Sequence, residues 1–223
     1  MSNVSVNGII ISSMPIGEYD RRVEILTSDY GRISAFASGA RKPSSELVAA
    51  SRVFALGTFE LYQGKSSYNM RHAKISEFFT ELSSSMELSG YGFYFLELSR
   101  YFSRENVNAS DMLNLLYYSL KALIKDSIDN RLVRAVFELK MLAINGLCPD
   151  PDRIIKPDGR FSIGRELNAS CAYTINYVLA SEASSLYKFR LSDEVLEEFR
   201  EVTSHLMKMT VDREFKSLEF LDV

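Results

Sequence analysis

A strand pattern, RISAFAS at residues 32–38, runs directly into GARKPSS at residues 39–45. Alternation of polar and apolar residues is typical of a β-strand with one buried face. The glycine that follows lets the backbone turn tightly, and Arg41 and Lys42 place two positive charges beside that turn. The stretch predicts a loop that contacts phosphate groups, although Arg-Lys pairs in turns are most often only solvated.

Short strand patterns continue over the first 80 residues. The segments are separated by turn residues such as Pro15-Ile16-Gly17 and Gln63-Gly64-Lys65. We expect five strands, at residues 4–14, 21–28, 32–38, 52–62 and 68–79. Five strands with one long connection after the third are typical of a small closed barrel of the OB type. A five-stranded SH3-like barrel fits the periodicity almost as well.

The apolar spacing becomes helical after Phe79. Apolar residues recur every three or four positions, which is typical of core-facing helices. We expect helices at residues 88–102, 112–123, 132–143, 174–186 and 192–207, and a short segment at 212–221. The fold class is therefore predicted to be α+β. A five-stranded OB-type β-barrel domain over residues 1–80 precedes a helical domain over residues 81–223, with a small irregular insertion at about residues 147–173.

Short polar residues mark several helix ends. Ser110 or Asp111 is expected to cap the second helix and Asn130 the third, because such side chains accept hydrogen bonds from free backbone N–H groups. Asn145-Gly146 is expected to end the third helix, and Ser192 to cap the fifth.

The composition is that of a globular protein. The chain has 223 residues, of which 46% are hydrophobic and 12% aromatic, enough for sizeable cores. No apolar run reaches the roughly 18 residues that a membrane helix needs, and the first residues lack a signal-peptide pattern. Cys148 and Cys171 are too few for a disulfide framework, which is typical of a reducing compartment. We therefore expect a cytoplasmic protein without membrane contact.

Charge is divided unevenly along the chain. The formal net charge is −3, but residues 1–78 hold nine Lys and Arg against seven Asp and Glu, a net charge of +2. Residues 79–223 hold seventeen against twenty-two, a net charge of −5. The positive balance of the first part permits a nucleic-acid site there without requiring one.

Several sequence blocks resemble one known family. The first blocks resemble the amino-terminal signature of the RecO family of bacterial recombination mediators. They are GIIISS (8–13), GEYDR (17–21), LT (26–27), YGRISAFA (30–37) and GARKP (39–43). Further family blocks resemble, in the same order, FELY (59–62), FELK (137–140) and FKSLEFL (215–221). The resemblance covers almost the whole chain.

This resemblance implies an OB-fold domain followed by a helical domain. It also implies a protein that binds single- and double-stranded DNA, anneals complementary strands, associates with RecR and with single-stranded-DNA-binding protein, and helps to load RecA onto coated single strands. Such a protein acts in the RecFOR pathway of recombinational repair, in the cytoplasm at the nucleoid. Such a protein binds DNA and partner proteins and catalyses no covalent reaction, so no cofactor and no catalytic residue is expected.

A DNA-binding barrel needs cations for phosphates and aromatic faces for bases. Arg41 and Lys42 are the strongest candidates, because a glycine precedes them and no apolar residue is expected to pin their loop to a core. Arg21 and Arg22 point to opposite faces of a strand, so at most one shares a groove with Arg32. The candidate DNA contacts are Arg21, Arg32, Arg41, Lys42, Arg71 and Lys74, with Arg22 and Lys65 as further cations and Tyr30 as a stacking residue. The other barrel aromatics, Phe36 among them, are expected in the core.

The chain departs from the family at one point. Many relatives carry a four-cysteine zinc knob in the helical domain, whereas the corresponding residues 150–173 contain only Cys171. Structural zinc takes four Cys or His ligands, so we expect this insertion to fold without metal. The two histidines, His72 and His205, are expected to be structural or surface residues.

Two other classes of function are possible for such a chain. An enzyme is not favoured, because the sequence has no Walker loop, nucleophile elbow or His-Glu-x-x-His helix. The main alternative is a protein-interaction adaptor, whose barrel binds a partner protein instead of DNA.

The resemblance also implies a docking site for a partner. The acidic tail of single-stranded-DNA-binding protein needs an apolar pocket edged by cations. The candidate contacts for it are Arg131, Arg134 and Lys140, beside the apolar stripe of the third helix.

Overall fold

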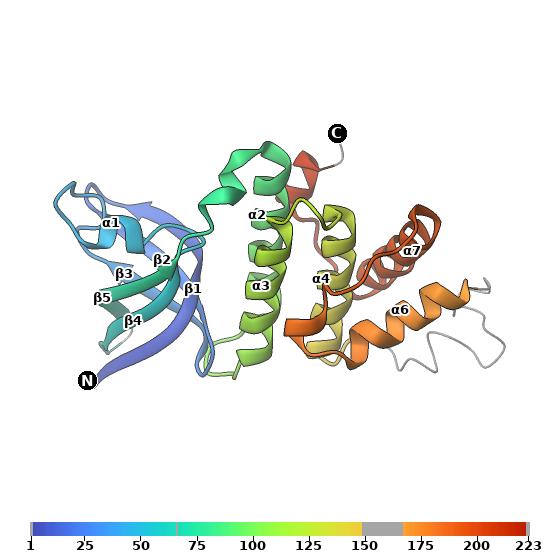
Figure 1. Cartoon of the computed structure of the whole chain (residues 1–223). Helices are drawn as coiled ribbons and strands as arrows, with labels where there is room; N and C mark the ends of the chain where they lie inside the picture. Colours follow the sequence, from blue (N-terminus) through green and yellow to red (C-terminus); the bar gives the residue numbers. More distant parts are fainter. Residues whose placement is uncertain (1, 66, 149–166, 222–223) are drawn as a thin grey trace. The chain divides into compact units, whose positions relative to one another are not determined.

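The computed structural model describes residues 2–65, 67–148 and 167–221 (Figure 1). The chain divides into two compact units. The barrel unit comprises Met1–Ser84 and Phe93–Leu113, and the helical unit comprises Ser85–Gly92 and Asn114–Val223. Most of the predicted insertion, residues 149–166, lies outside the described residues.

The five strands are β1 (Ser2–Ile16), β2 (Asp20–Thr27), β3 (Gly31–Ala37), β4 (Leu56–Gln63) and β5 (Tyr68–Glu77). They close into a barrel in the order β1-β2-β3-β5-β4, with β4 paired to β1. All pairings are antiparallel except that of β3 with β5. This is the topology of an OB barrel, so the α+β class and the OB-type barrel are confirmed and the SH3-like alternative is wrong.

Alternate residues of each strand point into the barrel. Val23 and Ile25 of β2, Ile33 and Ala35 of β3 and Phe59 of β4 form part of one buried core. Because a shift of one residue would turn this apolar set toward water, the core fixes the register of the strands. The intervening residues of β2 and β3 point outward.

The long connection after β3 contains a helix that the strand pattern does not predict. This helix, α1 (Leu47–Ala50), is a single turn that buries Leu47 and Ala50. The fourth strand begins at Leu56 rather than at the expected Arg52. The reason is the backbone of Phe54, whose φ of 69° is a left-handed conformation that a regular strand does not contain.

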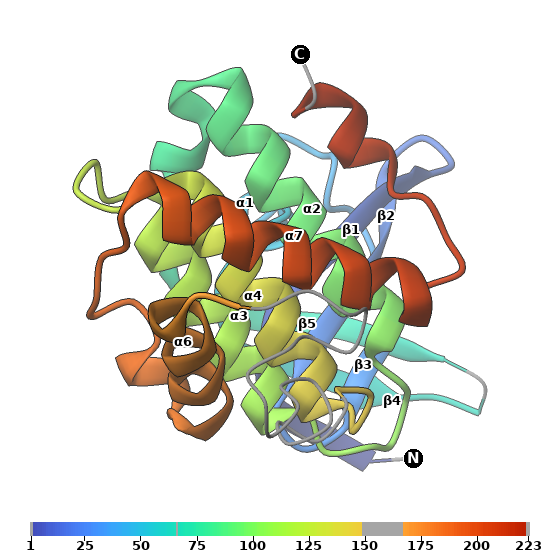
Figure 2. The same ribbon diagram turned by 90° about the vertical axis from the view of Figure 1, so that its right-hand side faces the viewer.

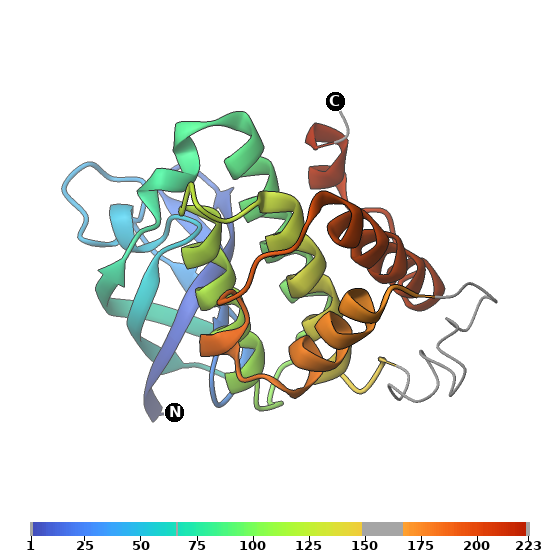
Figure 3. The ribbon, with the colours of Figure 1, turned by 45° about the vertical axis from the view of Figure 1, so that its right-hand side comes forward.

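Helices dominate the described residues after β5. They are η1 (Thr80–Ser84), α2 (Met86–Phe102), α3 (Ser110–Leu123), α4 (Asn130–Ile144), α6 (Ala169–Ala180), η2 (Ala183–Ser185), α7 (Asp193–Thr210) and η3 (Lys216–Phe220). Within the helical unit, α4, α6 and α7 pack against one another (Figures 2 and 3). Each buries apolar side chains, such as Phe137 of α4, Ile175 of α6 and Phe199 of α7.

Two helix starts differ from expectation. Asp129, rather than Asn130, caps α4, because its side chain accepts a hydrogen bond from the backbone N–H two residues later. Ser110 and Asp111 lie inside α3. The Asn108 side chain instead accepts a hydrogen bond from the Ser110 N–H at 3.1 Å. In both cases the capping residue lies one to three positions before the expected one.

The end of α4 and the start of α7 agree with the sequence, whereas α6 does not. Asn145 and Gly146 end α4 as expected, and Gly146 has a φ of 67° that favours glycine. Ser192 precedes α7 at the N-cap position, as expected. Helix α6 begins at Ala169 and ends at Ala180, about six residues before the expected end, because the chain becomes extended at Ser181.

Candidate nucleic-acid interface

Two loops of the barrel unit are fastened to each other. One is the β1–β2 turn at residues 17–19, and the other follows β3 at residues 39–42. Three hydrogen bonds hold them: Gly39 N–H to Asp20 Oδ1 at 2.7 Å, Arg41 N–H to the Tyr19 carbonyl at 2.8 Å, and Arg41 Nη1 to the Gly17 carbonyl at 3.1 Å. We call residues 17–19 and 39–42 together the loop clamp.

The second loop of the clamp is anchored to the barrel. Ala40 is buried, with 1% of its surface exposed, and belongs to the barrel core. Gly39 adopts a φ of 70°, which turns the chain back toward the start of β2. The expectation that no apolar residue pins this loop is therefore wrong. Arg41 and Lys42 extend from a fixed backbone.

Neither cation of the clamp is in direct contact with a carboxylate in the described residues. Lys42 Nζ lies 5.1 Å from the centroid of the Tyr19 ring, and Arg41 donates to a neutral carbonyl. Tyr19 is 46% exposed, and a hydrogen bond with Glu18 raises its pKa, so the phenol is neutral at neutral pH. The clamp thus presents two cations and an aromatic face.

A row of outward side chains lies on the barrel wall near the clamp. Met14 of β1 pairs with Arg22 of β2, and Arg22 pairs with Phe36 of β3, so the three side chains are neighbours on the outer face. Arg22 is exposed, and its Nε donates to Ser34 Oγ at 2.9 Å. Met14 is 52% exposed and Phe36 is half-buried. The row therefore places one more cation beside apolar and aromatic surface.

This row corrects two expectations. Arg22 is the exposed cation at the start of β2, whereas Arg21 is half-buried on the inward side and donates to Ser13 Oγ at 3.1 Å. Phe36 is not a barrel-core residue, because Ala35 and Ala37 occupy the inward positions beside it. Strict alternation over residues 32–38 is the sequence signal that places Phe36 on the outer face.

Arg32 holds a helix to the barrel instead of standing free. Its Nη1 lies 3.9 Å from Glu24 Oε1 and donates to the Arg100 carbonyl of α2 at 3.3 Å. Arg100 also forms an ion pair with Glu24. Because all three residues belong to the barrel unit, this cluster is internal to it. Arg32 shares the Glu24 carboxylate with Arg100 and is held by contacts inside the unit, which argues against a role in binding phosphate.

The other predicted DNA contacts are Arg71, Lys74 and Tyr30. Arg71 of β5 stacks on Tyr62, with its guanidinium 5.4 Å from the ring centroid. Lys74 is exposed on β5 opposite Thr58 of β4. Tyr30 is 37% exposed at the β2–β3 turn, at the end of β2 far from the clamp, about 20 Å away at 3.3 Å per strand residue. The structure therefore brings Arg22 to Arg41 and Lys42. Asn69 of β5 pairs with both Phe36 and Tyr62, so Arg71, which stacks on Tyr62, extends the outer row, whereas Tyr30 lies at the far end of β2.

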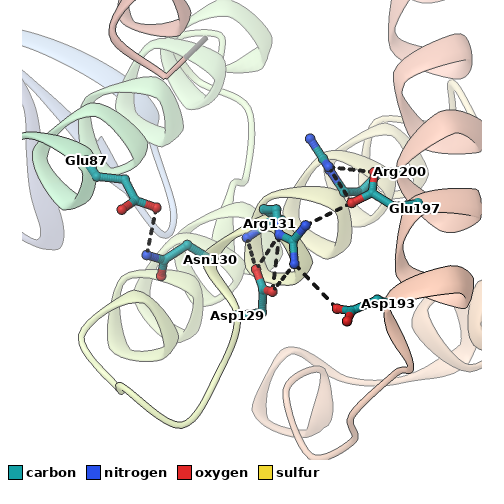
Figure 4. Close-up of polar contacts among 7 residues, drawn as sticks. All are labelled: Glu87, Asp129, Asn130, Arg131, Asp193, Glu197 and Arg200. Atoms are coloured by element: carbon teal, nitrogen blue, oxygen red, sulfur yellow. Dashed lines mark hydrogen bonds and ion pairs between the residues drawn. The ribbon is translucent and has the colours of Figure 1, made fainter. Parts of the chain in front are cut away.

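In the helical unit, Arg131 of α4 is surrounded by carboxylates (Figure 4). Its partners are Asp129 at 2.7 Å, Glu197 of α7 at 2.9 Å and Asp193 of α7 at 3.7 Å. Hydrogen bonds from Arg131 hold the pKa of Asp129 below its usual value. Arg200 adds a second cation on Glu197, with both N–O distances at 2.8 Å. The cluster joins α4 to α7, and its three carboxylates outnumber its two cations.

The other two predicted partner contacts on α4 also have partners inside the helical unit. Arg134 Nε pairs with Glu138 at 2.9 Å, and the Glu138 side chain is almost fully buried. Lys140 Nζ donates to the Leu179 carbonyl at 2.8 Å, near the negative end of the α6 dipole. These contacts stabilise the packing of α4. The carboxylate partner of Arg134 argues against that residue as a contact for an acidic tail.

A pocket of about 510 Å³ lies beside α6, in a place that the sequence does not predict. Its lining residues are Ala169, Ser170, Tyr173, Thr174, Tyr177, Lys188, Phe189, Arg190 and Leu191. The rings of Tyr177 and Phe189 meet edge to face at 5.2 Å. Lys188 and Arg190 are exposed, and in the part of the chain that the structure describes neither forms an ion pair. Alternation of aromatic and cationic residues in YKFR (187–190) is the only local sequence signal for this pocket.

Family models match both parts of the chain. The model for the N terminal part of recombination protein O matches residues 1–79, and the model for its C terminal part matches residues 83–219. The chain belongs to the RecO family. The resemblance of the sequence blocks is thereby confirmed over nearly the full length.

Curated RecO proteins align with the chain from end to end. A protein of Acetivibrio thermocellus named DNA repair protein RecO is 28% identical over 99% of this chain and 97% of its own length. Proteins with the same name from Alkaliphilus metalliredigens and Clostridium novyi are 26% and 24% identical. They cover 97% and 100% of this chain, and 97% and 94% of their own lengths, respectively.

The zinc knob implied for many RecO proteins finds no ligand set in the described parts. Among residues 2–65, 67–148 and 167–221, no group of three or more His, Cys, Asp and Glu side chains is placed to hold a metal ion. Cys171 is buried in α6. Burial raises the pKa of the half-buried Cys148 thiol. No described helix is long and apolar enough to cross a membrane.

Proposed function

We propose that this RecO-family chain is a DNA-binding mediator of recombinational repair. It binds single- and double-stranded DNA, anneals complementary strands, and helps to load RecA onto single strands coated with single-stranded-DNA-binding protein. It acts with RecR at the nucleoid, and it carries out no bond chemistry. Membership of the RecO family supports the role in repair, and the loop clamp is the observation that supports DNA binding by the barrel.

The clamp suits a single strand. Arg41 uses one of its five N–H donors on a carbonyl, so donors remain for phosphate oxygens. Lys42 and Arg22 supply further positive charge within the same region. Tyr19 and Phe36 offer aromatic surface on which unpaired bases stack, a contact that tolerates any base. Such a site binds the backbone without selecting sequence.

Annealing follows from this mode of binding. Cations that neutralise the phosphates of two strands reduce the repulsion between them. Stacking and backbone contacts leave the Watson–Crick edges of the bases free to pair. Because pairing is downhill once repulsion is reduced, annealing needs no nucleotide cofactor.

The test is annealing of complementary oligonucleotides by the full chain across a salt series, with and without ATP. We expect acceleration over the spontaneous rate at low salt, loss of the acceleration as salt rises, and no effect of ATP. Annealing that depends on ATP, or no acceleration at any salt concentration, would contradict the proposal. A chain that binds a partner protein but no DNA would favour the adaptor alternative.

A second part of the proposal concerns the partner. The aromatic pocket beside α6 combines apolar walls with the exposed cations Lys188 and Arg190. These are the features that the acidic tail of single-stranded-DNA-binding protein requires, and the cations of α4 already have partners. We therefore place the docking site of that tail in the pocket.

A labelled peptide with the partner's acidic tail sequence tests this placement by fluorescence anisotropy. Arg190→Ala and Tyr173→Ala are expected to weaken binding, since one removes charge and the other removes a wall of the pocket. The matched control is Arg134→Ala on α4, compared at equal folded fraction. If the pocket variants bind the peptide as tightly as the natural chain and the α4 variant binds it more weakly, the docking site lies on α4.

A further inference from the structure

A carboxylate holds the clamp together. Asp20 is the first residue of β2, and its Oδ1 accepts the Gly39 N–H at 2.7 Å. Gly39 is the residue with the left-handed backbone at the start of the second loop. The hydrogen bond therefore fixes the point at which that loop leaves β3. A charged acceptor makes it stronger than a neutral pair would be.

Both cations of the clamp, Arg41 and Lys42, follow Gly39 in the chain, so their contacts depend on the path of the loop. Arg41 N–H reaches the Tyr19 carbonyl at 2.8 Å, and Arg41 Nη1 reaches the Gly17 carbonyl at 3.1 Å. Lys42 Nζ lies over the Tyr19 ring. If the loop leaves β3 along a different path, all three contacts are lost together. Arg41 and Lys42 then lose the positions in which they stand beside the aromatic face.

We propose that Asp20 is a positioning residue for DNA, one that raises DNA affinity although its charge repels phosphate. The inference rests on the proposed DNA site and names the group that pre-organises it. Asp20 has two effects of opposite sign. Its charge weakens the attraction of the clamp for a polyanion, while its hydrogen bond keeps Arg41 and Lys42 in place and so lowers the cost of ordering them on binding.

Two substitutions separate these effects. Asp20→Asn removes the charge and keeps an oxygen that accepts the Gly39 N–H. Asp20→Ala removes both the charge and the acceptor. Glu18→Gln is the matched control, because Glu18 is an exposed carboxylate of the same turn whose hydrogen bond is to Tyr19 rather than to the second loop. If Asp20 acts only through charge, all three variants bind DNA more tightly than the natural chain.

The experiment measures binding of an oligo(dT) strand to the full chain at one low salt concentration. We expect Asp20→Asn and Glu18→Gln to bind two- to threefold more tightly, at roughly the strength of one screened charge. We expect Asp20→Ala to bind about tenfold more weakly than Asp20→Asn, because it lacks the acceptor for the Gly39 N–H that Asp20→Asn keeps. Equal affinities for Asp20→Ala and Asp20→Asn would overturn the proposal.

A second readout needs no DNA. Hydrogen exchange at the Arg41 amide is expected to be faster in Asp20→Ala and unchanged in Asp20→Asn, because only the former releases the second loop. Unchanged exchange in Asp20→Ala would also overturn the proposal. If the natural chain binds no DNA, the DNA site fails, while the exchange result still reports on the hydrogen bond. Asp20→Ser, which moves the acceptor oxygen one bond back from Gly39 and so weakens this contact, replaces Asp20→Ala if that variant does not fold.

Discussion

The loop clamp and helix α4 contain the same kinds of cation and use them in opposite ways. In the clamp, Arg41 and Lys42 contact carbonyl oxygens and an aromatic ring. In α4, Arg131 contacts three carboxylates. A cation beside a carbonyl keeps its field, whereas one surrounded by carboxylates has its field cancelled. The partners of each cation therefore indicate a DNA site better than the number of cations in a segment.

The largest expected effect comes from the clamp itself. The double variant Arg41→Ala with Lys42→Ala should remain folded, because neither side chain is buried. For single strands the slope of log affinity against log salt falls by roughly 0.7 for each lost phosphate contact, so by about 1.4 for the pair. Binding titrations at several salt concentrations measure this slope, and circular dichroism checks the fold.

A matched control for that variant comes from the helical unit. Arg213→Ala with Lys216→Ala removes two exposed cations and the same formal charge. This control should leave the slope almost unchanged, because its charges lie in the acidic part of the chain. Equal losses in both double variants would show that only total charge matters, and an unchanged slope in the clamp variant would move the DNA site elsewhere.

Tyr19 should have the next largest effect. Tyr19→Ala removes the ring under Lys42 and is expected to weaken single-strand binding by about 1 to 3 kcal/mol. Tyr19→Phe keeps the ring and should bind nearly as well as the natural chain. Duplex binding should change less, because paired bases are not available for stacking. Equal losses for single and double strands would show that the ring supports the loops rather than bases.

The parts of this molecule that follow local rules could be predicted from sequence. Alternation located the strands within a few residues, and helical spacing located α2, α3 and α4. The start of β4 was missed because it depends on the left-handed backbone of Phe54, which no period in the sequence reveals. The cap of α4 was missed by one residue because Asp129 and Asn130 are both good capping residues.

The site was harder to predict because its residues meet through long-range contacts. Arg32 lies in a promising strand, but its partners Glu24 and Arg100 come from another strand and from a helix. Arg41 and Lys42 were identified correctly as exposed cations. Their anchoring was not, because it uses the Asp20 carboxylate and the Tyr19 carbonyl, about twenty residues earlier in the chain. The neighbours of a charge are set by tertiary structure, whereas its presence is read directly from the sequence.

A smaller effect, on stability, is expected from Arg131. Arg131→Ala leaves three carboxylates near one another without their shared cation. Because the Arg131 side chain is 40% exposed, solvent screens these pairs, and we expect a loss of about 1 kcal/mol in the free energy of unfolding of the helical unit. Urea denaturation followed by circular dichroism measures it. The slope of DNA binding against salt should not change, and a fall in that slope with unchanged stability would assign Arg131 to DNA after all.

The smallest effect concerns pH. It tests the same contrast between the α4 cation that contacts carboxylates and the clamp cations that do not. Hydrogen bonds from Arg131 lower the pKa of Asp129 from its usual value of 3.8. The folded state therefore favours the carboxylate. The resulting stabilisation is complete above that usual value and is lost as pH falls through the lower pKa of the folded state.

Asp129→Asn keeps a capping side chain and removes this titration. The difference in urea midpoint between the natural chain and Asp129→Asn should be constant near neutral pH and shrink below about pH 4. Because the Asp129 side chain is 38% exposed, the corresponding difference in the free energy of unfolding should stay below about 1 kcal/mol. A difference that does not change with pH would mean that the carboxylate acts on α4 only as a cap. In that case Arg131 would not be held by its charge, and the contrast between α4 and the clamp would rest on the packing of α4 against α7 rather than on ion pairs.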